Sequence, residues 1–191
     1  AVSQTIRGWH HGRIRAMRSE RARELLTRLT PNLLRAFAGA GSPDDAFARF
    51  ARFFAGLAAG VQVLALLEAR PALLDLLARL LTLAPPLADG LARRPALLDA
   101  VIDPQFMAPL AQDLPGRRTD QLRQRVRDSE NFEAQLNAAR RFQREEAFRI
   151  DVQLLDGIAT PAEAAAARTD LGQACVEAMT ACLDRIDRVN A

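Results

Sequence analysis

Apolar residues recur at intervals of three and four along most of the chain, the spacing that places them on one face of an α-helix. Leu26, Leu29 and Leu33 show this spacing, and Phe37 follows one turn later. Val and Ile never cluster as they do in strands. The pattern predicts an all-α fold, a multi-helix bundle of about eight to ten helices with one or two long helices near the C-terminal end.

Several helix starts carry capping signals. Ser19 is a predicted N-cap for a helix that begins at Glu20. The pair Thr30-Pro31 interrupts that pattern, as a kink or as a fresh start with proline at the first helical position. Ser42-Pro43-Asp44-Asp45 combines a cap, a proline and two acids at the positive end of a helix dipole, and predicts another start.

A six-residue motif, Arg-Pro-Ala-Leu-Leu-Asp, occurs at 70–75 and again at 94–99. It is compatible with a helical solenoid, but two copies fall short of the three or so that a repeat array needs. We favour two helices that begin alike, each with proline in its first turn.

The region 103–118 holds three prolines and a glycine, and predicts a loop with one short turn. Beyond it, 119–156 is helical with a joint at Ser129, and an unbroken helix over 129–156 would be about 42 Å long. Spacing predicts ion pairs Arg141–Glu145 and Glu145–Arg149 on this helix. These breaks divide the chain into a front part at 1–108, a loop and short helix at 109–128, and long helices at 129–191.

The last helix has the clearest start in the chain. Gly157 ends the preceding helix, and Thr160-Pro-Ala-Glu163 is a capping box with proline at the first helical position. Cys175 and Cys182 fall on this last helix, about 10 Å apart along its axis, too far for a disulfide. We expect both to be reduced core residues, which indicates the cytoplasm.

The amino-acid composition argues against two classes of partner. All 26 basic residues are Arg, the net charge is +3, and residues 1–35 alone carry eight Arg against two Glu. Only the start of the chain is basic, so we expect no nucleic-acid partner. No apolar run approaches the roughly 18 residues of a membrane span, so we expect no membrane partner either.

The basic start also holds both histidines and the single tryptophan. Two adjacent histidines point apart on a helix and lack further ligands, which argues against a metal site. We interpret the segment as a candidate domain or ligand contact with these members: Trp9, His10, His11, Arg13, Arg15 and Arg18.

No catalytic centre is apparent. Gly41-Ser42 precedes Asp44 and Asp45, but these acids are adjacent and open a helix, whereas a nucleotidyltransferase metal site needs alternating acids on a strand. Phosphate-binding glycine motifs and a nucleophile with a partnered histidine are also absent. We therefore predict no catalytic residues, no metal site and no cofactor in this segment.

Four stretches, in order, resemble glutamine synthetase adenylyltransferases, the bifunctional adenylyltransferase/adenylyl-removing enzymes of bacteria. They are GWHHGRIRAMRSERARELLTRLTPNLLRAFA, ARPALLDLLARLLTLAPPLADGLARRPALLDAVIDPQFMAPL, FEAQLNAARRFQREEAFRIDVQLLDG and the helix after it. The resemblance covers nearly the whole chain and is weakest over 108–129.

The resemblance implies a central position between two nucleotidyltransferase domains, each with a Gly-Ser and Asp-x-Asp site that uses Mg²⁺ and ATP. It implies a spacing and coupling role in nitrogen regulation, with the flanking domains and glutamine synthetase as partners. The alternative is a helical interaction module that docks glutamine synthetase or a PII-type regulatory protein.

Overall fold

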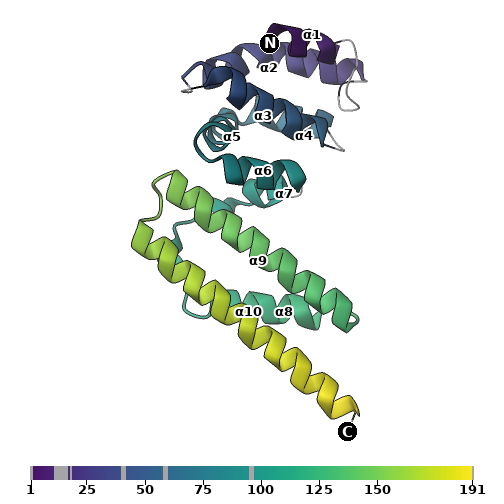
Figure 1. The fold of residues 1–191 in the computed structure, drawn as a ribbon, viewed down its shortest axis with the longest axis vertical. Coiled ribbons are helices and arrows are strands. Elements are labelled where there is room, and N and C mark those ends of the chain that lie inside the picture. The colour runs from purple at the N-terminus through teal and green to yellow at the C-terminus, as the bar shows by residue number, and fades with distance from the viewer. Residues whose placement is uncertain are drawn as a thin grey trace. The chain divides into compact units, whose positions relative to one another are not determined.

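The computed structural model describes residues 2–10, 17, 19–39, 42–57, 60–94 and 97–190. Within these residues the chain forms ten α-helices and short 3₁₀ turns, and no strand (Figure 1). The all-α prediction of about eight to ten helices is confirmed. The chain forms two compact units, the first over Ala1–Leu98 and the second over Asp99–Ala191.

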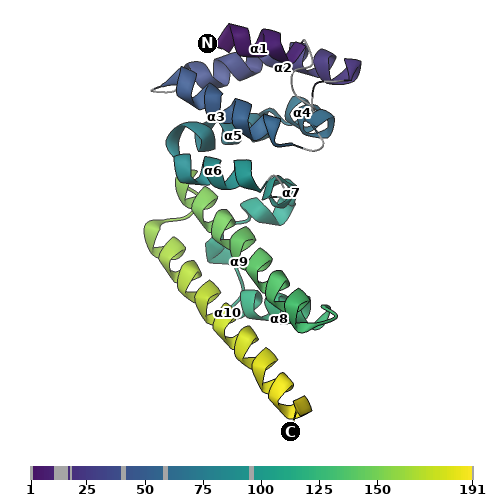
Figure 2. The same cartoon turned by 45° about the vertical axis from the view of Figure 1, so that its right-hand side comes forward.

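The first unit is built from short helices. α2 packs against α4 and α5, and α3 packs against α5 and α6. α7 (Leu97–Ile102) includes the boundary between the units. The bounds of the other helices, seen from a second side in Figure 2, are α1 Val2–His10, α2 Glu20–Ala38, α3 Pro43–Ala55, α4 Gly60–Ala69, α5 Pro71–Leu83 and α6 Pro85–Arg93.

Aromatic rings fill the centre of the first unit. Trp9 lies with its ring centroid 5.5 Å from that of Phe47 and 5.5 Å from that of Phe54, and Phe50 stacks on Phe54 at 5.8 Å. Phe50 and Phe54 are fully buried. Such aromatic contacts add about 1 kcal/mol each beyond the burial of their area, so they join α1 firmly to α3.

Two helices of this unit begin at Glu20 and Pro43, where the capping signals predict them, although the Ser42 side chain makes no capping hydrogen bond. The Ser19 hydroxyl accepts a hydrogen bond from the Ala22 N–H at 3.1 Å, and α2 begins at Glu20 as predicted. Of the two alternatives at Thr30-Pro31, a kink or a fresh start, the fresh start is wrong, because α2 continues through Pro31 to Ala38. Burial of Leu29 and Leu33 on either side of the proline offsets the loss of one backbone hydrogen bond.

The second unit is a bundle of three helices, α8 (Arg117–Arg127), α9 (Phe132–Leu155) and α10 (Pro161–Asn190), which pack against one another. Two 3₁₀ turns, η2 (Pro104–Met107) and η3 (Leu110–Gln112), precede α8 in the region predicted as a loop. The joint expected near Ser129 is present, since the Asn131 side chain caps a new helix. α9 has 24 residues and is therefore about 36 Å long rather than 42 Å.

The turn between α9 and α10 forms as predicted. Gly157 ends the helix at φ 72°, a backbone conformation that glycine adopts without strain. In the capping box the Thr160 hydroxyl accepts from the Glu163 N–H at 3.2 Å, and the Glu163 carboxylate accepts from the Thr160 N–H at 2.7 Å. The Thr160 hydroxyl also donates to the Glu163 carboxylate at 2.8 Å. The bond from the backbone N–H most strongly, and then the bond from the hydroxyl, lower the pKa of the Glu163 carboxyl.

The core of the second unit is aliphatic, with Leu122, Ile150 and Ala174 fully buried. Both cysteines are free, as predicted, with Cys182 buried and Cys175 half-buried. Burial raises the pKa of the Cys175 thiol, so it stays protonated near neutral pH.

The three-part division of the chain into 1–108, 109–128 and 129–191 stays a prediction. In the structure the residues group as 1–98 and 99–191, so that 109–128 falls inside the second unit. Within the described ranges no single helix is long and apolar enough to cross a membrane, although α5 and α6, bent by 115°, pass that test as a pair by length and composition.

Candidate functional site

The residues of the candidate contact near the N-terminus are described only in part. Trp9 is buried in the first unit, 4% exposed, and contributes to its core. His10 ends α1, and nothing further is described of its side chain. The remaining members lie outside the described residues, so their role stays a prediction: His11, Arg13, Arg15 and Arg18.

A metal centre has no structural basis in the part of the chain that is described. No three His, Cys, Asp or Glu side chains among those residues are grouped so that they could hold a metal ion.

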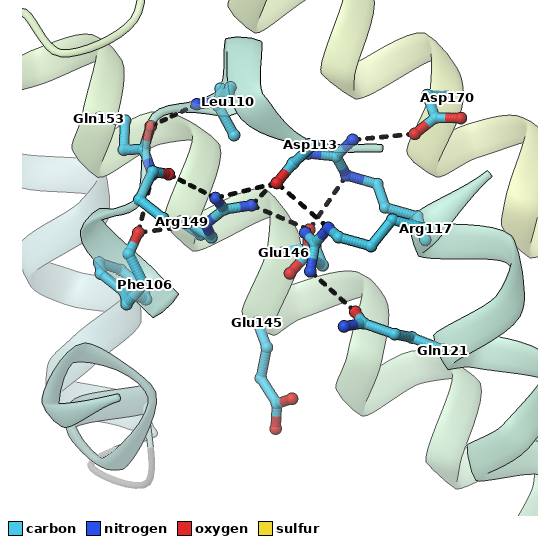
Figure 3. A network of polar contacts seen from close by, with 12 residues as sticks. Phe106, Leu110, Asp113, Arg117, Gln121, Glu145, Glu146, Arg149, Gln153 and Asp170 are labelled. Carbon is cyan, nitrogen blue, oxygen red and sulfur yellow. Dashed lines mark hydrogen bonds and ion pairs between the residues drawn. The ribbon is translucent and has the colours of Figure 1, made fainter. Parts of the chain in front are cut away.

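The most developed polar arrangement is a network inside the second unit, centred on Asp113 (Figure 3). Asp113 lies between η3 and α8 and accepts from Arg118 at 2.6 Å and from Arg149 of α9 at 3.0 Å. Arg118 also donates to Glu146 of α9 at 3.0 Å and to Asp170 of α10 at 2.8 Å. One guanidinium thus joins the loop before α8 to both long helices.

Arg117 completes the network at its outer side. It donates to Glu146 at 2.6 Å and to Gln121 at 2.9 Å, and its Nε lies 3.2 Å from Asp113 Oδ1. This Nε makes no hydrogen bond, so the contact with Asp113 is electrostatic. The network, defined as the six residues Asp113, Arg117, Arg118, Glu146, Arg149 and Asp170, contains three cations and three anions and is neutral as a set.

Burial makes this network structurally significant. Arg118 and Arg149 are 3% and 4% exposed, and an unpaired charge at such depth costs several kcal/mol. Although burial alone would raise the pKa of the Asp113 carboxyl, the hydrogen bond from Arg149 and the charges of the three arginines lower it overall. Asp113 is therefore an ionised anchor at neutral pH rather than a proton donor.

Two side chains of α9 extend the network to the backbone of the loop. Arg149 donates to the carbonyl of Phe106 at 3.1 Å and to that of Ala108 at 2.6 Å. Gln153, one turn on and fully buried, donates to the same two carbonyls at 2.7 and 2.8 Å and accepts from the Leu110 N–H at 3.2 Å. These bonds satisfy backbone groups that would otherwise be buried without partners.

A shallow cleft lies beside the network, with Arg118 and Asp170 on its wall and Leu110, Leu114 and Ala167 around them. Asp113 and Glu163 also line the cleft. Asp113, Arg118 and Asp170 pair within the network. Glu163 accepts hydrogen bonds from Thr160. The cleft therefore presents no activated nucleophile, and the chemistry of the arrangement is restraint of the fold.

Sequence reasoning missed this network. The predicted partner of Arg149 on its own helix was Glu145, but Glu145 pairs instead with Arg125 of α8 at 2.6 Å. Arg125 also lies over the Phe142 ring at 5.0 Å from its centroid. One signal for this network is present in the sequence: many arginines and acidic residues lie between positions 113 and 170, in helices that also have an apolar face.

Known proteins that are similar to this chain belong to one family. The sequence model of a family described as glutamate-ammonia ligase adenylyltransferase matches residues 74–187. The chain is 41% identical over 189 residues to the bifunctional glutamine synthetase adenylyltransferase/adenylyl-removing enzyme of Caulobacter vibrioides. It is 41% and 42% identical to the enzymes of the same name from Mesorhizobium japonicum and Agrobacterium fabrum.

The alignments cover 98%, 93% and 93% of this chain but 18% of each of the three relatives, so the chain spans less than a fifth of their length. No solved structure matches the chain.

Proposed function

Because the chain belongs to the glutamate-ammonia ligase adenylyltransferase family, we propose that it acts as the central helical segment of a bifunctional adenylyltransferase/adenylyl-removing enzyme. The segment carries no catalytic site. It spaces two nucleotidyltransferase domains and couples their activities toward glutamine synthetase in nitrogen regulation.

The observation that carries this proposal is the buried network of the second unit. Arg118 contacts the loop, α9 and α10 at once through Asp113, Glu146 and Asp170. Because charged hydrogen bonds of this kind have narrow geometry, they restrain three elements as one body. A restrained body transmits a displacement from one end to the other, whereas an isolated helix bends or frays.

A connecting role is also compatible with the length of the chain, which covers only 18% of each of the three relatives. The proposal assigns ATP, Mg²⁺ and the reacting groups to the flanking nucleotidyltransferase domains. It includes a PII-type regulatory protein as a source of signal, and a cytoplasmic location, which the free thiols of Cys175 and Cys182 support.

A flexible insertion in the full-length enzyme tests the proposal. Four residues, Gly-Gly-Ser-Gly, are inserted after Gln135 in the first turn of α9, and both activities are measured with and without glutamine and the regulatory protein. We expect both activities to persist and their regulation to be lost. Unchanged regulation would contradict the coupling role.

The matched control inserts the same four residues after Ser129, in the connection between α8 and α9 and outside either helix. This connection should absorb the insertion, so regulation should remain. Loss of regulation in the control alone would show that the connection, and not the helix, carries the signal, and would also contradict the proposal.

A further inference from the structure

Three arginines on α9 have no partner in the part of the chain that the structure describes. Arg140, Arg141 and Arg144 are exposed, and none of them takes part in an ion pair, hydrogen bond or ring contact among the described residues. Their spacing of three and four places them on one face of the helix. We call these three residues the arginine face.

The arginine face contrasts with the rest of the second unit. Every arginine of α8 has an acidic or amide partner. The same holds for those arginines of α9 and α10 that lie outside the arginine face and whose side chains are described. The arginines with such a partner are Arg117, Arg118, Arg123, Arg125, Arg127, Arg149 and Arg168. The fold thus uses those side chains, but it does not use the arginine face.

Leaving these charges together has a local cost. Like charges at i,i+3 and i,i+4 destabilise a helix by a few tenths of a kcal/mol per pair. Arg141 also lines a groove at the corner of α8 and α9, with Arg125, Asp128, Ser129 and Ala138. An anionic side chain entering this groove would meet two guanidinium groups and one carboxylate.

The charge of the whole unit indicates which kind of anion fits. Residues 99–191 contain 12 Arg and 16 acidic residues, so the unit is acidic overall. Nucleic acids and anionic membranes are attracted by a broad basic surface, which this unit lacks. A local set of three cations in an acidic surrounding suits short-range pairing with carboxylates of a protein, where it sets orientation and partner choice.

We propose that the arginine face docks an acidic surface of glutamine synthetase. The relatives' names give that protein as what the enzymes act on, and the inference rests on the proposed function for this reason. Arg140, Arg141 and Arg144 pair with carboxylates of the partner, with the groove beside Arg141 receiving one of them. The face positions the protein substrate and takes no part in the chemistry.

The test uses the full-length enzyme with the substitutions Arg140→Glu, Arg141→Glu and Arg144→Glu together. Adenylylation of purified glutamine synthetase is measured as a function of its concentration, at low and high salt. We expect KM for glutamine synthetase to rise about tenfold or more with kcat unchanged, and the salt dependence of KM to weaken. An unchanged KM would overturn the proposal.

Two controls make the outcome specific. The triple lysine variant keeps the charge and should stay within about threefold of the wild-type KM. The variant Arg70→Glu, Arg93→Glu and Arg94→Glu changes the charge equally on exposed residues of the first unit and should leave KM unchanged. An equal rise in KM with this variant would show a long-range charge effect and would overturn the proposal.

If charge reversal impairs folding, as judged by circular dichroism, the triple alanine variant decides the question, since alanine favours the helix. Binding of a 20-nucleotide RNA that is lost on charge reversal, with KM for glutamine synthetase unchanged, would also overturn the proposal. Regulation by glutamine is read separately, so a failure of docking leaves the insertion test of coupling unaffected.

Discussion

The guanidinium of Arg149 donates to the carboxylate of Asp113 at 3.0 Å, although Asp113 lies 36 positions earlier in the chain. The same Asp113 oxygen accepts from Arg118 at 2.6 Å. One carboxylate therefore neutralises two buried cations from different helices, and it is the residue on which the second unit depends most.

Replacing Asp113 by Asn should lower the free energy of unfolding by about 3 kcal/mol, because it leaves two buried guanidinium groups short of negative charge. Chemical denaturation of the chain, followed by circular dichroism, measures the change. The control Asp120→Asn removes a carboxylate that is 79% exposed and 3.9 Å from Arg123, and it should change stability by less than about 0.5 kcal/mol. Equal effects of the two substitutions would contradict the central place of Asp113.

The same site predicts a pH dependence. The pKa of Asp113 is lower in the folded chain than its ordinary value, so the carboxylate stabilises the fold above about pH 4, and this stabilisation is lost as the pH falls through the folded pKa. The stability difference between the wild type and Asp113→Asn should thus be constant from pH 7 to 5 and shrink below about pH 4. Denaturation curves at several pH values test this, and a difference that stays constant as the pH falls further below about 4 would count against it.

Gln153 offers a test of the backbone contacts. Gln153→Leu keeps the volume but removes three hydrogen bonds to the loop. It should cost about 2 kcal/mol, since the buried Leu110 N–H loses its partner and the two carbonyls keep only the bonds from Arg149. Amide hydrogen exchange at Leu110, whose N–H bonds the Gln153 side chain, should accelerate. The exposed Gln173→Leu serves as the control, with little change expected at Leu110.

Trp9 tests the core of the first unit. Trp9→Ala should lower the free energy of unfolding by about 3–5 kcal/mol, because it leaves a cavity among Phe47, Phe50 and Phe54. Trp9→Phe, which keeps an aromatic ring, should cost clearly less. Since Trp9 is the single tryptophan, its emission in the wild type should lie at short wavelength, and emission at the wavelength of exposed tryptophan would contradict its burial.

Local signals in the sequence predicted much of the fold. The caps at Ser19 and Thr160 and the joint near Ser129 depend on neighbours within a few residues, and all three formed as expected. The sequence left a kink and a fresh start open at Pro31, because tertiary burial of the apolar face of α2 outweighs the missing N–H and no local rule measures that burial.

The network was beyond such rules for the same reason. Spacing along one helix pairs Arg149 with Glu145, whereas in three dimensions each finds a partner on another element. Only the fold reveals that Arg149 is buried while Arg144, five residues earlier, is exposed. The two arginines look alike in the sequence, yet one supports the structure and the other is free for recognition.

The bonds from Arg149 and Gln153 to the loop reach main-chain carbonyls and an N–H, which every residue except proline provides in full. The path of the loop around Phe106 and Ala108 is consequently held through its main chain by two side chains of α9, in addition to the ring of Phe106, which lies against Phe148. Substitutions at exposed loop positions such as Ala111 and Gln112 therefore leave these hydrogen bonds in place, whereas substitutions at Arg149 or Gln153 remove them.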